Sequence, residues 1–182
     1  MIKVEPLAIP DVKLVTLRRF SDERGWFMES FRESAHAAAG LPGSYVQDNV
    51  SFSMRRGTIR GLHYQLPPVE QGKLVRVVRG AIWDVAVDIR RGSPSFGRHV
   101  AVRLDADAAT MLFVPAGFAH GFCTLMDDTE VEYKVTAVYA PDRERAIRWD
   151  APDLAIAWPL DGPPTISAKD AVAPDLAGAE FP

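Results

Sequence analysis

The sequence predicts an all-β domain of the jelly-roll kind, a barrel or sandwich of antiparallel strands. Short runs in which apolar and polar residues alternate recur with turn residues between them. Only the Ala-rich segment 32–39 has the character of a helix, and no internal repeat is present. At 182 residues the chain is expected to form a single domain, residues 1–182, with a substantial core.

Strand character recurs along the first 140 residues of the chain. Strands are expected at 12–20, 26–31 and 45–52, in two runs within 57–80, and at 81–89, 99–104, 111–114 and 130–139. The helix at 32–39 contains no β-branched residue and stops at Gly40. Seven of the fourteen prolines lie from Pro141 to Pro182, so this tail is expected to wrap the surface in an extended form.

The composition is that of an ordinary water-soluble globular protein, with 47% hydrophobic and 25% charged residues. The formal net charge of −3 and the absence of a Lys/Arg block disfavour nucleic acid as a partner. The single Cys123 excludes an internal disulfide and fits a reducing compartment. The N-terminus does not have the pattern of a secretory leader, and no run of about eighteen apolar residues occurs. We therefore expect a cytoplasmic protein that binds a small molecule or another protein.

The segment 57–80 combines two strand-like runs with an unusual set of polar side chains, which include Arg60, His63 and Lys73. His63 shares its strand parity with Gly61 on a face with little apolar material, which favours a side chain that lines a cavity. The alternative is a hydrogen-bonded structural histidine, the commoner case for a histidine in a strand. Arg60 has the opposite parity, so a bulge or bend at Gly61 is required if both residues serve one site.

The segment Pro115–His120 has the spacing Pro-x-Gly-x-x-His, which resembles the second motif of the cupin superfamily of small jelly-roll barrels. The first cupin motif contains His-x-His, whereas the matching place here reads His63-Tyr64-Gln65. Because a catalytic metal normally has three protein ligands, two histidines alone give a metal site little support. The pattern indicates a cupin that has lost its metal and kept its pocket.

Two other strands carry candidate side chains. Tyr133 shares its parity with Val131 and Val135 and is expected to point into the barrel, the alternative being a core tyrosine with its hydroxyl at the rim. The run Gln47-Asp48-Asn49 lies inside the strand at 45–52, where polar side chains are costly to bury without partners. A solvated strand edge is the alternative for this run.

These segments together resemble one family, the dTDP-4-dehydrorhamnose 3,5-epimerases. The resemblance extends from about Ile9 to Pro174, and it is specific because many short motifs occur in the same order. The matching stretches are Asp22–Glu29, Gln47–Asn49, Arg60–Gln65, Gln71–Arg76, Trp83–Arg90, Pro115–Phe122, Glu132–Lys134, Ile147–Asp150 and Ser167–Asp170. Ala146 stands where the family often has glycine, which bears on the turn that carries Glu144.

The resemblance implies a metal-free cupin jelly roll without a cofactor, usually a homodimer with strands exchanged or shared. It implies that dTDP-4-keto-6-deoxy-D-glucose is inverted at C3 and C5 to give dTDP-4-keto-L-rhamnose. Carried over by position, the catalytic residues are the base His63, its orienting partner Asp170, the acid Tyr133, and Lys73, which stabilises the enolate oxygen. The implied substrate-binding residues are Arg24, Glu29, Gln47, Asp48, Asn49, Arg60, His120, Glu144 and Lys169.

Three alternatives to the double epimerase remain open. A related enzyme would invert only C3 or only C5, or move the keto group, of another dTDP sugar. A metal-dependent cupin oxygenase or isomerase would bind a stoichiometric metal and lose activity to chelators. A non-catalytic barrel would bind the sugar nucleotide without turning it over.

Overall fold

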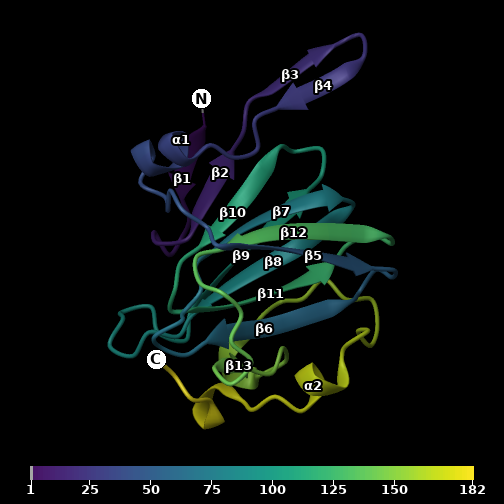
Figure 1. Ribbon diagram of the computed structural model, residues 1–182. Coiled ribbons are helices and arrows are strands. Elements are labelled where there is room, and N and C mark those ends of the chain that lie inside the picture. The colour runs from purple at the N-terminus through teal and green to yellow at the C-terminus, as the bar shows by residue number, and fades with distance from the viewer. Residues whose placement is uncertain (1) are drawn as a thin grey trace.

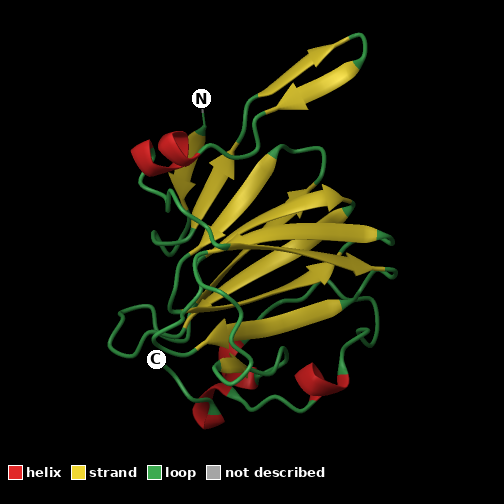
Figure 2. Cartoon of the chain, in the orientation of Figure 1, coloured by secondary structure: helices red, strands yellow, loops and turns green. Residues whose placement is uncertain are grey.

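The computed structural model describes residues 2–182 as a sandwich of two antiparallel sheets (Figure 1). In spatial order, the six-stranded sheet contains β1 (Lys3–Pro6), β2 (Lys13–Thr16), β10 (Thr110–Val114), β7 (Lys73–Arg79), β12 (Thr129–Val135) and β5 (Gln47–Ser53). The five-stranded sheet contains β13 (Glu144–Ala146), β6 (Ile59–Gln65), β11 (Phe118–Thr124), β8 (Ala81–Asp88) and β9 (His99–Asp105). Strands dominate and the helices are short (Figure 2), so the predicted all-β class is confirmed.

The main core lies between the sheets, where one face of each sheet is apolar. Val75 and Leu112 from the six-stranded sheet pack in one cluster with Ile82, Ala86 and Phe118 from the five-stranded sheet. Each large apolar side chain removed from water contributes on the order of 2 kcal/mol. This inner layer therefore fixes how the two sheets face each other.

The outer face of the five-stranded sheet is also buried, because the C-terminal tail covers it. Leu62 and Val85 on that face pack with Ile147, Ala151 and Leu154 from the tail. The tail is mostly extended, as predicted, and its short elements are η1 (Pro152–Leu154), α2 (Ala168–Ala171) and η2 (Leu176–Gly178). β8 is buried at both parities for this reason, since both faces of this central strand are covered.

The N-terminal region departs from the prediction of one strand at 12–20. That segment divides into β2 and β3 (Arg19–Asp22), and the backbone N–H of Leu17 donates to Ala109 O at 2.9 Å between them. β3 pairs with β4 (Gly25–Met28) in a hairpin that projects from the sandwich (Figure 1). The predicted helix is present as α1 (Glu33–Ala38). Within residues 2–182, no helix is long and apolar enough to span a bilayer.

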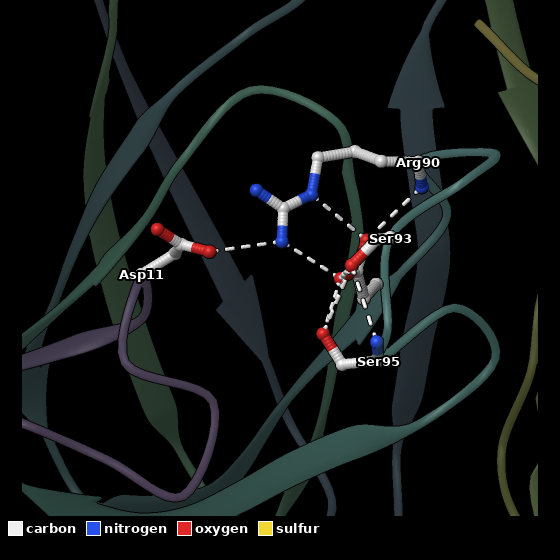
Figure 3. Close-up of polar contacts among 5 residues, drawn as sticks. Asp11, Arg90, Ser93 and Ser95 are labelled. Atoms are coloured by element: carbon white, nitrogen blue, oxygen red, sulfur yellow. Dashed lines mark hydrogen bonds and ion pairs between the residues drawn. The ribbon is translucent and has the colours of Figure 1, made fainter.

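The loop after β8 is held by a buried carboxylate (Figure 3). Asp88 accepts hydrogen bonds from the Arg90 side chain and backbone and from the hydroxyls of Ser93 and Ser95, the latter two at 2.6 Å. Burial alone would raise the pKa of Asp88, but these hydrogen bonds outweigh it and hold the pKa well below its usual range. Arg90 also donates to Asp11 at 2.9 Å, which ties the loop to the N-terminal segment.

Candidate active site

A cavity lies between the sheets, with walls from β5, β6, β7 and β12 and from the α2 region of the tail. It has two adjoining parts of about 290 and 440 Å³, and both parts are lined by His63, Lys73 and Tyr133. The smaller part is also lined by Gln47, Asn49, Tyr64, Gln65, Gln71, Tyr139 and Glu144. The larger part is also lined by Ser51, Thr58, Ile59, Arg60, His120, Phe122, Thr165, Ile166, Ser167, Lys169 and Asp170.

His63 lines the cavity, whereas Leu62 and Tyr64 beside it on β6 pack in the apolar cluster that contains the tail. Its Nε2 lies 2.7 Å from Oδ1 of Asp170, which stands in α2 on the C-terminal tail. The other carboxylate oxygen accepts from the backbone N–H of Gly61 at 3.3 Å. The pair therefore joins two segments that are more than one hundred residues apart in the chain.

The Asp170 carboxylate is held in its ionised form. Burial acts to raise its pKa, but the hydrogen bond and charge of His63 and the hydrogen bonds from Gly61 and Ser167 lower the pKa below its ordinary value. A carboxylate behind an imidazole fixes the ring tautomer and supports the imidazolium that forms when the ring accepts a proton. The His63 side chain remains 31% exposed, so its free nitrogen can meet a ligand in the cavity.

A bulge at Gly61 allows Arg60 and His63 to line the same cavity. The pairing of β6 with β11 steps from His120–His63 to Phe122–Arg60, so β6 contains one extra residue at this point. Gly61 has a φ of +122°, and a Cβ there would lie 2.5 Å from the Cα of Gly121. Only glycine fits this position, and the parity conflict predicted from the sequence is resolved by the bulge.

Lys73 begins β7 and is buried, with its Nζ donating to the backbone oxygen of His63 at 3.1 Å. Burial lowers the pKa of Lys73 to about 8, against the attraction of the Asp84 and Glu144 carboxylates, which acts to raise it. An ammonium in such a place is a fixed positive charge with few waters around it. It suits the stabilisation of a negative oxygen that forms during a reaction.

His120 forms a second imidazole–carboxylate pair. Its Nε2 lies 2.5 Å from Oδ1 of Asp84 on the neighbouring strand β8, and both side chains are almost fully buried. The second oxygen of Asp84 makes no hydrogen bond to any described residue. Residues 2–182 contain no group of three or more His, Cys, Asp or Glu side chains placed to hold a metal ion.

Tyr133 points into the sandwich from β12, as its parity with Val131 and Val135 predicted. Burial raises the pKa of its phenol, while the nearby Arg60 acts to lower it. His63 and Tyr133 belong to different sheets and line the same two parts of the cavity. Two proton-carrying groups thus approach the enclosed space from opposite walls.

The opening of the smaller part carries a chain of polar side chains. The hydroxyl of Tyr139 donates to Oε2 of Glu144 at 2.8 Å, and Lys169 forms an ion pair with the same carboxylate. Burial acts to raise the pKa of Glu144, but the hydrogen bonds from Lys169 and Tyr139 lower it.

Tyr139 was not among the residues predicted for the site, because the alternation over 130–139 placed it in a strand. In the structure that strand, β12, ends at Val135. The position of Tyr139 two residues before Pro141 was the available signal for a loop.

The remaining predicted contacts lie outside the cavity. Asp48 is on the outer face of β5 and pairs with Lys134 at 2.8 Å, whereas Gln47 and Asn49 face inward. The other two lie in or just after the projecting hairpin and are bound to neighbouring side chains, Arg24 to Asp22 at 2.5 Å and Glu29 to Arg32 at 3.0 Å. One copy of the chain therefore does not bring Arg24, Glu29 or Asp48 to the cavity. The predicted residues that line the cavity include Arg60, His63, Lys73, His120, Tyr133, Glu144, Lys169 and Asp170.

Comparison with known proteins identifies the family and the fold. Residues 6–178 match the family model described as dTDP-4-dehydrorhamnose 3,5-epimerase. A Pseudomonas aeruginosa protein of that name is 50% identical over 183 residues, covering 100% of both chains. A Bacillus anthracis epimerase crystallised with TDP and pyrophosphate is 45% identical, with a TM-score of 0.93 over 96% of this chain and 99% of that chain. A Legionella pneumophila epimerase in complex with dTDP-4-keto-L-rhamnose is 41% identical, with a TM-score of 0.94 over 98% and 94%.

The two-sheet sandwich, together with these matches, defines an isomerase of the cupin fold. The chain belongs to the dTDP-4-dehydrorhamnose 3,5-epimerase family. Its activity is the epimerisation that gives the family its name, in dTDP-L-rhamnose biosynthesis. Relatives in this family bind dTDP-sugar ligands in their crystal structures.

Proposed function

We propose that His63, oriented by Asp170, is the base that removes the protons at C3 and C5 of dTDP-4-keto-6-deoxy-D-glucose. The observation that carries this proposal is the 2.7 Å contact between the partly exposed imidazole and the buried carboxylate. Protons at C3 and C5 are acidic because both carbons flank the C4 ketone. The imidazole of a histidine in water has a pKa of about 6.5, which is matched to such a transfer near neutral pH.

Lys73 then stabilises the negative charge that forms on the C4 oxygen. A buried ammonium stabilises an enolate oxygen more strongly than water does, because the surroundings are poorly polarisable and the charge is already in place. His120 and Arg60 line the same part of the cavity and hold the sugar. These steps transfer protons only, so the scheme uses neither a redox cofactor nor a metal.

Inversion requires that the proton return to the face opposite the one from which it left. Tyr133 is the acid in this scheme, because it lines the cavity from the six-stranded sheet while His63 lines it from the five-stranded sheet. Burial raises the pKa of Tyr133, which keeps the phenol protonated at neutral pH. Gln47, Asn49, Glu144 and Lys169 line the same cavity and are the proposed contacts for the nucleotide.

A homodimer would complete the site. Arg24 and Glu29 lie in or beside the projecting hairpin, and Phe20, Trp26 and Phe27 on that hairpin are largely exposed. Exposed aromatic side chains of this kind are typical of protein interfaces. We therefore assign the hairpin, with Arg24 and Glu29, to the cavity of a partner subunit, and Asp48 to the contact between subunits. The buried thiol of the single Cys123 is compatible with the cytoplasm as the location.

The test is incubation with dTDP-4-keto-6-deoxy-D-glucose in deuterated water, with the product followed by NMR. Deuterium is expected at both C3 and C5 of an L-configured product. Deuterium at one carbon alone would show a single epimerase of a related dTDP sugar. Binding without any exchange would show a non-catalytic barrel, and exchange that stops with a chelator would restore the metal-dependent alternative.

A further inference from the structure

The loop 136–140 follows β12 and has no regular secondary structure, although it lies against the cavity. It carries Tyr139, which is half exposed and lines the smaller part of the cavity. A loop of this kind has backbone N–H and C=O groups without strand partners, and such groups need other partners when water is excluded. The partners therefore determine where the Tyr139 ring lies.

Three glutamine side chains supply most of these partners, each from a different part of the sandwich. Gln71 Nε2 donates to Ala137 O at 2.8 Å. Gln65 Nε2 donates to Val138 O at 3.2 Å, and Gln65 Oε1 accepts from Ala140 N at 2.8 Å. Gln47 Oε1 accepts from Tyr139 N at 2.8 Å.

These are the only glutamines in the chain, and the only asparagine, Asn49, accepts a 2.8 Å hydrogen bond from Gln47 Nε2 in the same place. A primary amide presents a donor and an acceptor on one planar group, as a peptide unit does. The glutamines thus take the role that a neighbouring strand would have. A glutamate could accept but not donate, and a methionine of similar length could do neither.

We propose that Gln65 and Gln71 are positioning residues for the nucleotide end of the substrate, acting through the 136–140 loop and Tyr139. The proposal rests on the proposed function, in that the cavity binds a dTDP sugar. The planar Tyr139 ring at the opening is a surface for the planar base of the nucleotide. Holding the loop in one conformation before binding reduces the ordering cost of association, so the amides act on affinity.

The alternative is that the amides only stabilise the fold. The two roles differ in their dependence on Tyr139. A positioning role acts through the ring, so its effect on nucleotide binding disappears when the ring is removed. A general loss of stability would weaken binding to the same degree with or without the ring.

The experiment measures the affinity for TDP by calorimetry in a double-mutant cycle. Gln71→Met is expected to raise the Kd for TDP about threefold, and Gln65→Met about tenfold because it removes more bonds. In a Tyr139→Ala background, the same substitutions are expected to change the Kd less than about twofold. At saturating substrate, the rate of C–H exchange should change less than the Kd does, because the amide hydrogen bonds hold the loop and not His63 or Tyr133.

Thr129→Val is the matched control, because it removes a buried 2.9 Å bond to Met126 O at the other end of β12. This variant should leave the Kd for TDP unchanged. If Gln65→Met does not fold, the test rests on Gln71→Met, which loses only one hydrogen bond to the loop. An unchanged Kd in Gln71→Met, or an equal loss in the Tyr139→Ala background, would overturn the positioning role. Either result would still leave C–H exchange in the wild-type protein. If instead the epimerase proposal fails, the wild-type protein will show no exchange, but the Kd values of the TDP double-mutant cycle can still be measured.

Discussion

The two imidazole–carboxylate pairs of the cavity look alike and differ in what surrounds them. His63 and His120 are direct partners in the β6–β11 register, and their carboxylates lie at 2.7 and 2.5 Å. The His63 side chain is 31% exposed, whereas that of His120 is 7% exposed. Asp170 reaches His63 from the tail, while Asp84 stands on the strand next to His120.

We propose that this difference separates a reactive pair from a supporting pair. A base must present its free nitrogen to the substrate, and only His63 has that exposure. Asp170 approaches from a short helix that touches β6 at few points, so its place depends on how the tail is anchored. Asp84 is fixed within the sheet, beside the buried ammonium of Lys73, whose pKa its charge raises. We therefore expect the first pair to act on the proton and the second on the charge that the proton leaves behind.

The largest expected effect comes from replacing the two imidazoles in turn. His63→Asn should lower the rate of C–H exchange about 10⁴-fold, the upper end of what a general base contributes. His120→Asn should lower the rate about tenfold, the equivalent of one lost hydrogen bond to the sugar. Exchange in deuterated water, followed by NMR, measures both. TDP binding measured in parallel should persist in both variants and so confirms that the cavity is folded.

Equal losses in the two variants would contradict the separation, because they would make both imidazoles part of one proton relay. Undiminished exchange in His63→Asn would remove this residue from the role of base. In that case the more exposed pair would be a binding group.

A smaller effect is expected when the remote carboxylate is changed. Asp170→Asn keeps the size of the side chain but can hold the imidazole in the wrong tautomer, which should lower kcat by about 10² to 10⁴. Removal of the carboxylate also removes support for the imidazolium. The KM should change little, since Asp170 acts on the substrate through His63. A change confined to KM would show that Asp170 binds substrate directly.

The sequence predicted the reactive pair better than the supporting one. Parity within β6 favoured the inner face for His63 and required a bulge or bend at Gly61 if Arg60 was to share the site, and the structure has that bulge. These are local properties of one strand. The partner Asp170 was implied only by the family resemblance. Asp84 was visible on its strand, but its contact with His120 depends on the register between β8 and β11, which no single segment specifies.

Other parts of the site depend on long-range arrangement in the same way. The 130–139 alternation continued past Val135, yet the chain leaves the sheet there, and Gln65 and Gln71 form hydrogen bonds with the loop that follows. The segment 12–20 alternated as one strand but divides where the hairpin leaves the sandwich. Tertiary partners overrode local pattern in both cases.

The smallest expected effect comes from removing the charge of Asp84, the carboxylate of the His120 pair. Asp84→Asn removes a negative charge that favours the Lys73 ammonium, so the Lys73 pKa should fall below about 8. The rate at pH 7 should fall only about threefold, but the alkaline limb of the pH–rate profile should move to lower pH. Of the other groups that line the cavity beside Lys73, Tyr133 has a pKa raised by burial, and Glu144 has a pKa lowered by Lys169 and Tyr139 against the effect of burial. Neither of them titrates near pH 8.

His120→Asn is the matched control for that shift, because it breaks the same 2.5 Å contact and keeps the Asp84 carboxylate. The alkaline limb should stay in place in this variant. If the alkaline limb of the pH–rate profile moves equally in both variants, the contact between His120 and Asp84, and not the charge of Asp84, sets the pKa of Lys73. A limb that moves in neither would mean that Lys73 does not carry the charge on which the reaction depends. Asp84 would then serve His120 alone, and the two pairs would differ only in exposure.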